Sequence, residues 1–380
     1  MTISGVGVGN ANASPTSALL LHILQDISGR IATILFAHRV GTALEPECKT
    51  YRLAADVFND IAMILDCLSP GVPAGPARVI VLSTAGVLRA LCGVAGGSSK
   101  ASLSAHFAKG GNLAELNAVG SVVISHITSF STTWLILLIL LALHLSMNYA
   151  AVRAVQMTSL NRQRANIAFS ALLDSDQSLA LYLGLDLGPT PTQTEKEWKF
   201  LTPAQVSKHE RIFHRDGALQ WTQHSSSSTH TITHHLGYAQ IGVSMSAFLG
   251  SSAFGATSFQ RTLPLERVAA VFADEFYILF LVPLSTAEDK VKWNASILLK
   301  RGCVVEHQLK AWAHALLAAR VLARLMMGSS VDDVLAVIQG TLKLLNTDAR
   351  FEKYLTGLNG VGWDVDIAAL ETRGGRRIDL

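Results

Sequence analysis

Charged residues are scarce in this chain of 380 residues: together they make up 16% of it, against about 25% in a typical soluble domain. Hydrophobic residues reach 49%, and the mean hydropathy is +0.34. The net charge is only +3, and no run of basic residues is interleaved with aromatic residues, which argues against a nucleic-acid groove. The composition therefore predicts an integral membrane protein whose partner is a lipid bilayer, in an organelle that the sequence does not identify.

Cysteine and catalytic motifs are also sparse. The four cysteines are far apart and form no CxxC pair, so neither a disulfide framework nor a zinc site is expected. The chain has no nucleophile elbow and no HExxH motif, and we assign no catalytic residue and no cofactor. Four histidines occur in a serine-rich stretch without carboxylate or cysteine partners, where we expect a mobile loop and no metal: His224, His230, His234 and His235.

One long apolar run stands out at residues 130–149. No Asp, Glu, Lys or Arg occurs between Glu115 and Arg153. About 20 apolar residues in a helix span the hydrocarbon layer, so the run predicts a transmembrane helix. Arg153 and two further arginines follow the run, which places its C-terminal side in the cytoplasm or its equivalent by the positive-inside rule.

Three earlier apolar stretches, at 17–40, 53–68 and 79–97, carry internal charges. Lipid tolerates such charges where they face other helices or water, so we expect them to gather in one interior cluster. Two interpretations remain open: a ligand site or polar pathway, and ion pairs that fix the register of the helices. The expected members are Asp26, Arg30, Arg52, Asp56, Asn59, Asp60 and Arg89.

The C-terminal half has the composition of a soluble domain. We predict a helical membrane domain over 1–160, a linker over 161–197, and a small soluble α/β or α+β domain over 198–380, so that the fold class is mainly α. A low-complexity insertion is expected at 222–235.

Local patterns predict elements within the soluble domain. Strands are expected at 275–283, 294–300 and 363–370, and an amphipathic helix at 306–327. Ser330 and Asp333 form a capping signal for a further helix.

A glycine-rich stretch at 92–106 runs into two serines and a lysine. It is no P-loop, because two serines separate Gly97 from Lys100 and an alanine follows the lysine. Ser98, Ser99 and Lys100 could still hold an anion at a helix N-terminus. We favour a helix-packing face, through which the chain would form homo- or hetero-oligomers, because small residues recur at steps of three and four: Gly86, Ala90, Gly93, Gly97 and Ala101.

Several stretches together resemble the RUS (root UV-B sensitive) family: GVGVGNANASPTSALLLHILQDISGRI, YRLAADVFNDIAMILDCLSP, GVAGGSSKASLSAHFAKGGNLAELNA, LNRQRANIAF and LKRGCVVEHQLKAWAHALLAARVL. The resemblance implies a membrane-associated, helix-rich protein, with plant members linked to root UV-B responses, vitamin B6 homoeostasis and auxin transport. It supplies no catalytic residues. The family pattern has an upstream segment and a segment after Ala118 that are absent here, so we expect the helical domain to be truncated.

Two functional hypotheses follow. The first, which we prefer, is a membrane protein without catalytic activity that carries a small ligand or scaffolds partners through the polar cluster and the small-residue face. The second is a membrane-bound enzyme or cofactor-binding protein that holds a phosphorylated ligand such as pyridoxal phosphate near Gly93 and Lys100.

Overall fold

The computed structural model forms two compact units, Met1–Val155 and Gln156–Leu380. It describes residues 15–73, 75–107, 130–176, 178–179, 198–224, 231–251, 265–284, 291–325, 330–371 and 377–379. These residues are mainly helical and include one four-stranded sheet, which confirms the mainly α class and the α+β character of the second half.

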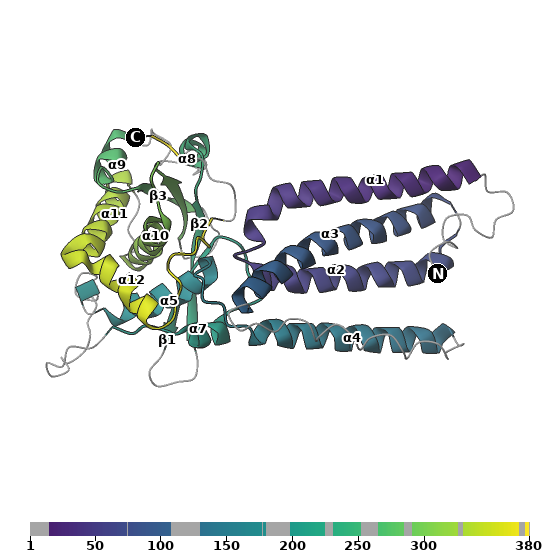
Figure 1. Cartoon of the computed structure of the whole chain (residues 1–380). Coiled ribbons are helices and arrows are strands. Elements are labelled where there is room, and N and C mark those ends of the chain that lie inside the picture. The colour runs from purple at the N-terminus through teal and green to yellow at the C-terminus, as the bar shows by residue number, and fades with distance from the viewer. Residues whose placement is uncertain are drawn as a thin grey trace. The chain divides into compact units, whose positions relative to one another are not determined.

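The first unit consists of long helices, and all four apolar stretches of the sequence lie in them. α3 packs against both α1 and α2, and α4 packs against α2 (Figure 1). A 3-10 turn that contains Pro70 separates α2 from α3, because proline cannot continue the hydrogen-bond ladder of the helix before it. The helices are α1 (Pro15–Val40), α2 (Cys48–Leu68), α3 (Pro76–Phe107) and α4 (Phe130–Ala154).

The second unit is built on a mixed sheet with the strand order β1-β2-β4-β3. β2 and β4 pair in parallel at its centre, and the outer pairs are antiparallel. β3 and β4 confirm the strands expected near 275–283 and 294–300. The strands are β1 (Ala218–His224), β2 (Thr231–Ile241), β3 (Tyr277–Leu284) and β4 (Lys292–Leu299).

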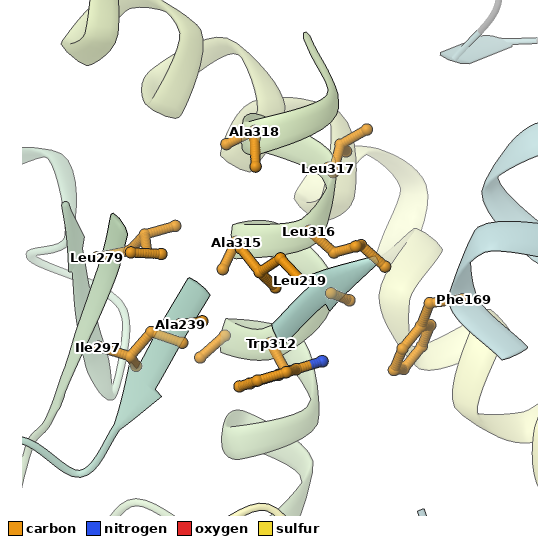
Figure 2. Packing of buried hydrophobic residues seen from close by; sticks show 14 of the residues in the cluster. Phe169, Leu219, Ala239, Leu279, Ile297, Trp312, Ala315, Leu316, Leu317 and Ala318 are labelled. Atoms are coloured by element: carbon orange, nitrogen blue, oxygen red, sulfur yellow. The ribbon is translucent and has the colours of Figure 1, made fainter. Parts of the chain in front are cut away.

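Helix α10 forms the centre of the core of the second unit, and it confirms the amphipathic helix expected at 306–327. Its residues Trp312, Ala315 and Leu316 are fully buried. Figure 2 shows Ala239, Leu279 and Ile297 of the sheet on one side of α10 and Phe169 of α5 on the other. The helices of this unit are α5 (Arg162–Ser175), α7 (Pro203–His209), α8 (Met245–Ser251), α9 (Leu265–Val271), α10 (Val305–Leu325), α11 (Val331–Asn346) and α12 (Arg350–Gly360). The Ser330 side chain caps α11 by accepting from the Asp333 N–H, as predicted.

Three expectations for this half are wrong. The linker at 161–197 begins too early, because α5 is a buried helix of the second unit. The insertion at 222–235 contains the end of β1 and the start of β2, which pair with each other, and His234 and His235 lie in β2, where a mobile loop was expected. The strand expected at 363–370 is a single bridge at Asp364 followed by bends. His230 and residues 180–197 lie outside the described residues.

A fully buried histidine on α10 links three elements of this core. The His314 Nδ1 atom lies 3.0 Å from the Tyr277 hydroxyl, and its Nε2 atom lies 2.9 Å from the Thr341 hydroxyl and 3.0 Å from the Ile338 carbonyl oxygen. Burial lowers the pKa of His314 to about 3, because the charged imidazolium would lose its hydration. The folded protein therefore holds this side chain in its neutral form.

The second unit is expected to lose stability in mild acid. Between pH ~6.5 and ~3 an unfolded chain protonates His314 and the folded chain does not, so the free energy of unfolding falls as the pH falls, by up to ~1.4 kcal/mol per pH unit. Urea unfolding followed by tryptophan fluorescence at pH 7 and pH 5 measures the slope. His314→Gln should flatten it, and His235→Gln, at an exposed position of β2, should leave it unchanged. Equal slopes in the His314→Gln variant and the parent would contradict this assignment.

Candidate functional site

The predicted interior cluster comes together only in part. Asp26 and Arg30 pair with each other at 2.8 Å on an exposed face of α1. α1 contacts α3 through Gly29, which lies buried beside Ala90. Arg89 pairs with Asp66 of α2, an acid that the sequence analysis missed. The expectation that Asp26, Arg30 and Arg89 join the interior cluster is therefore wrong.

The residues that do come together lie where α2 faces α4, and we call them the polar cluster: Arg52, Asp56, Asp60 and His144. Arg52 Nη2 lies 3.3 Å from Asp56 Oδ1, one helical turn further along α2. Asp60 follows after one more turn, and its Oδ1 lies 3.1 Å from the Nδ1 atom of His144 on α4. This bond joins α2 to α4. Asn59 is half-buried and takes no part in these contacts among the described residues.

Both acids of the polar cluster are buried. The Asp56 and Asp60 side chains are each 9% exposed. Asp60 has both oxygens within reach of His144, at 3.1 and 3.3 Å. The second oxygen of Asp56, Oδ2, is buried with no hydrogen-bond partner among the described residues. A buried acceptor without a donor costs about 1–3 kcal/mol, and more when it is charged. The polar cluster therefore contains one acceptor, Asp56 Oδ2, that no described residue satisfies.

Helix α3 borders the polar cluster at Gly96, which has no side chain. A Cβ atom at Gly96 would lie 3.8 Å from Arg52 Nη1 and 3.6 Å from the Ala55 Cβ atom. Cys92, one turn earlier and half-buried, lies within electrostatic range of Arg52 and Asp56. Among the described residues no three His, Cys, Asp or Glu side chains are grouped as a metal site would require.

The small-residue face of α3 meets another helix over part of its length. Gly86 and Ala90 lie against Gly29 of α1, at 3.9 and 3.7 Å from a Cβ atom placed there. Gly93 and Gly97 are exposed, with no described atom within 4 Å of such a Cβ atom, and Ala101 is exposed as well. Among the described residues, Gly93, Gly97 and Ala101 therefore do not form a closely packed helix face.

The premise of the anion site at Ser98, Ser99 and Lys100 is wrong. These residues lie inside α3, which is helical without a break from residue 76 to residue 107, so there is no helix N-terminus to offer free N–H groups. Ser99 is buried and its hydroxyl donates to the Ala95 carbonyl oxygen at 2.6 Å.

The polar residues of the LNRQRANIAF stretch have structural roles in the second unit. Asn161 caps α5, and Arg164 forms a buried ion pair with Glu210 at 2.8 Å. The Asn166 side chain accepts from the Trp312 indole N–H at 2.9 Å and donates to the Ala218 carbonyl oxygen at 2.7 Å. These contacts hold α5 against the core.

A hollow on the second unit is a weaker candidate than the polar cluster. It has a volume of about 570 Å³ and is lined by residues that include Lys300, Arg301 and Asp379. Arg301 and Asp379 pair with each other at 2.8 Å, and Lys300 donates to the Phe272 carbonyl oxygen. These charged groups already have partners, so the hollow is less suited to a charged ligand.

Two helices among the described residues are long and apolar enough to cross a membrane: Pro76–Leu103 within α3 and Trp134–Ala154 within α4. The second contains the apolar run at 130–149 that predicted a transmembrane helix, and the first contains the apolar stretch at 79–97. Only 11% of the most apolar window of each is buried inside the protein, whereas a core helix of a soluble protein is mostly buried.

Comparison with known proteins gives the family. The model of the vitamin B6 photo-protection and homoeostasis domain matches residues 1–118 and 117–176. The two matches meet at residues 117–118, the point after which a missing segment was expected from the sequence. RUS family member 1 of Dictyostelium discoideum is 36% identical over 51% of this chain and 38% of its own length. Protein root UVB sensitive 3 of Arabidopsis thaliana is 33% identical over 47% of this chain and 44% of its own length.

The chain thus spans about two fifths of the length of these relatives. No solved structure matches it. The family match contains every member of the polar cluster, from Arg52 on α2 to His144 on α4. These matches support a RUS family protein, and residues 1–176 match the vitamin B6 photo-protection and homoeostasis domain.

Proposed function

We propose that the helices of residues 15–154 are inserted in a membrane and bind or carry a small molecule at the polar cluster, without catalysing a reaction on it. The observation that carries this proposal is the Asp56 carboxylate, which is buried among apolar helices with one oxygen that has no partner among the described residues. Ionisable groups between membrane helices are costly, and they commonly mark binding sites or pathways.

Apolar side chains on the outside of these helices support insertion in a bilayer. On α1, Ile27, Ile31 and Leu35 recur every four residues and are 46–62% exposed. On α4, Leu135, Ile139 and Leu143 repeat the same spacing at 55–61% exposed. Such continuous apolar faces are unfavourable in water and favourable against lipid chains. The helices would thus present apolar faces outward and enclose the polar cluster.

The description of the family domain suggests the ligand, a compound of the vitamin B6 group. The second hypothesis, an enzyme or cofactor-binding protein that holds a phosphorylated ligand near Gly93 and Lys100, is less well supported, because its anion site would need a helix end that α3 does not have there. No catalytic role is proposed for the polar cluster.

Carbonate extraction of membranes that contain the full chain tests the insertion. The protein is expected to stay in the pellet, because α3 and α4 would be surrounded by lipid chains. The variant Ile139→Lys/Leu143→Lys places two charges on the exposed apolar face of α4 and should shift the protein toward the supernatant.

The matched control places the same two charges on the second unit. Val291 and Val304 are exposed apolar residues there, so Val291→Lys/Val304→Lys should leave the protein in the pellet. Release of the unaltered chain into the supernatant would contradict insertion.

A further inference from the structure

We infer that the ligand of the polar cluster offers a hydrogen-bond donor, preferably an ammonium group, to Asp56 Oδ2, and that it carries no phosphate on the position next to that group. This inference rests on the proposed function and names the chemical class of the ligand. It starts from the buried oxygen of the polar cluster that the described residues leave without a donor.

The charges around Asp56 favour a ligand with an ammonium group over one with a phosphate. Asp56 and Asp60 are the two acids of the polar cluster, and Arg52 is its only permanent cation. Arg52 already contacts Asp56 Oδ1, so its charge is shared with an acid of the protein. His144 is held by Asp60, and the neighbouring Cys92 adds no positive charge. A phosphate here would face two carboxyl groups, whereas an ammonium group would face an unfilled acceptor.

Geometry supports the same choice. A carboxylate oxygen such as Asp56 Oδ2 accepts hydrogen bonds, so it binds a group that donates. Charge-assisted hydrogen bonds are about twice as strong as neutral ones, so an ammonium group gains more than a hydroxyl group does. Gly96 of α3 lies beside Arg52 and has no side chain. α3 therefore approaches the polar cluster closely, and no side chain of Gly96 covers it.

Binding of four vitamin B6 compounds to the unaltered full chain in detergent distinguishes a preference for an ammonium group from a preference for a hydroxyl group or a phosphate. Pyridoxamine carries an ammonium group, pyridoxine has a hydroxyl group in its place, and each also exists as a 5′-phosphate. Isothermal titration is expected to show the tightest binding for pyridoxamine, binding at least tenfold weaker for pyridoxamine 5′-phosphate, and a smaller loss for pyridoxine. This comparison does not depend on the folding of any variant.

Asp56→Asn tests the named atom, because the amide keeps the size of the side chain and removes its charge. Pyridoxamine binding is expected to weaken at least tenfold, while Asp26→Asn, at an exposed acid paired with Arg30 on α1, should bind as the parent does. Size-exclusion chromatography and a thermal melt confirm that both variants are folded.

The outcomes are distinct. Binding of a 5′-phosphate compound as tight as or tighter than that of pyridoxamine would overturn the inference and leave the proposed ligand function standing. Unchanged pyridoxamine binding in a folded Asp56→Asn variant would overturn the assignment to Asp56. If none of the four compounds binds, the proposed vitamin B6 function fails, and the inference fails with it.

Discussion

Gly237→Ala is expected to destabilise the second unit by about 4 kcal/mol or more, at the exceptional end of the range for single substitutions. Gly237 pairs with Trp293 where β2 and β4 run in parallel, and its φ angle is +139°. A Cβ atom there would lie 1.8 Å from the Trp293 carbonyl oxygen and 2.5 Å from its amide nitrogen. Both atoms belong to the backbone, so the two central strands must separate to admit the methyl group.

The measurement is urea unfolding of the full chain in detergent, followed by tryptophan fluorescence. The matched control is Gly250→Ala on α8, where no described atom lies within 4 Å of the added Cβ atom. Alanine in a helix is slightly favoured over glycine, so this variant should be neutral or more stable by less than about 1 kcal/mol. If the two variants unfold at the same urea concentration, the parallel pairing of β2 with β4 is not as described.

Arg164→Met should cost about 3–5 kcal/mol, because it leaves a buried carboxylate without its guanidinium partner. The side chains of Arg164 and Glu210 are 2% and 5% exposed, and their ion pair measures 2.8 Å. Arg164 Nε also donates to the Ser159 carbonyl oxygen at 2.6 Å. The loss therefore combines an unpaired charge with the loss of a donor to a backbone acceptor.

A second substitution distinguishes the unpaired charge from lost packing. Arg164→Met/Glu210→Leu removes both charges, so it is expected to recover much of the stability that Arg164→Met loses. Arg301→Met breaks the Arg301–Asp379 pair, whose side chains are 79% and 65% exposed, and should change the free energy of unfolding by no more than about 1 kcal/mol. A double variant that is no more stable than Arg164→Met would show that the charge of Glu210 is not the cause.

Elements whose residues carry their own local signals were predictable from the sequence. The apolar spacing of α10 and the cap at Ser330 depend on residues a few positions apart, and both are confirmed. The start of β2 was missed, because its threonines and histidines resemble a low-complexity segment until pairing with β1 is known. α5 was missed because its face toward the core includes buried polar side chains such as Arg164 and Asn166, which pattern analysis assigns to the surface.

In the candidate site, too, contacts within one helix were predictable from the sequence and contacts between helices were not. The four-residue spacing of Arg52, Asp56 and Asp60 is enough to place them on one face of a helix. The partners from other helices were not predictable, since Arg89 meets Asp66 and His144 meets Asp60 only once the packing of α3 and α4 is set. The unpartnered oxygen of Asp56 likewise depends on which of the described helices surround α2.

The boundary between the two units has a consequence for anyone who cuts this protein into pieces. The family match ends at residue 176, but the first unit ends at Val155, and α5 lies between those points. Twelve consecutive residues of α5, from Arg162 to Leu173, are buried in the full chain. A fragment trimmed to the family match would keep this helix and discard the strands and helices against which it packs, so its exposed apolar and unpaired polar groups would favour aggregation. A fragment that ends near residue 155 avoids that defect.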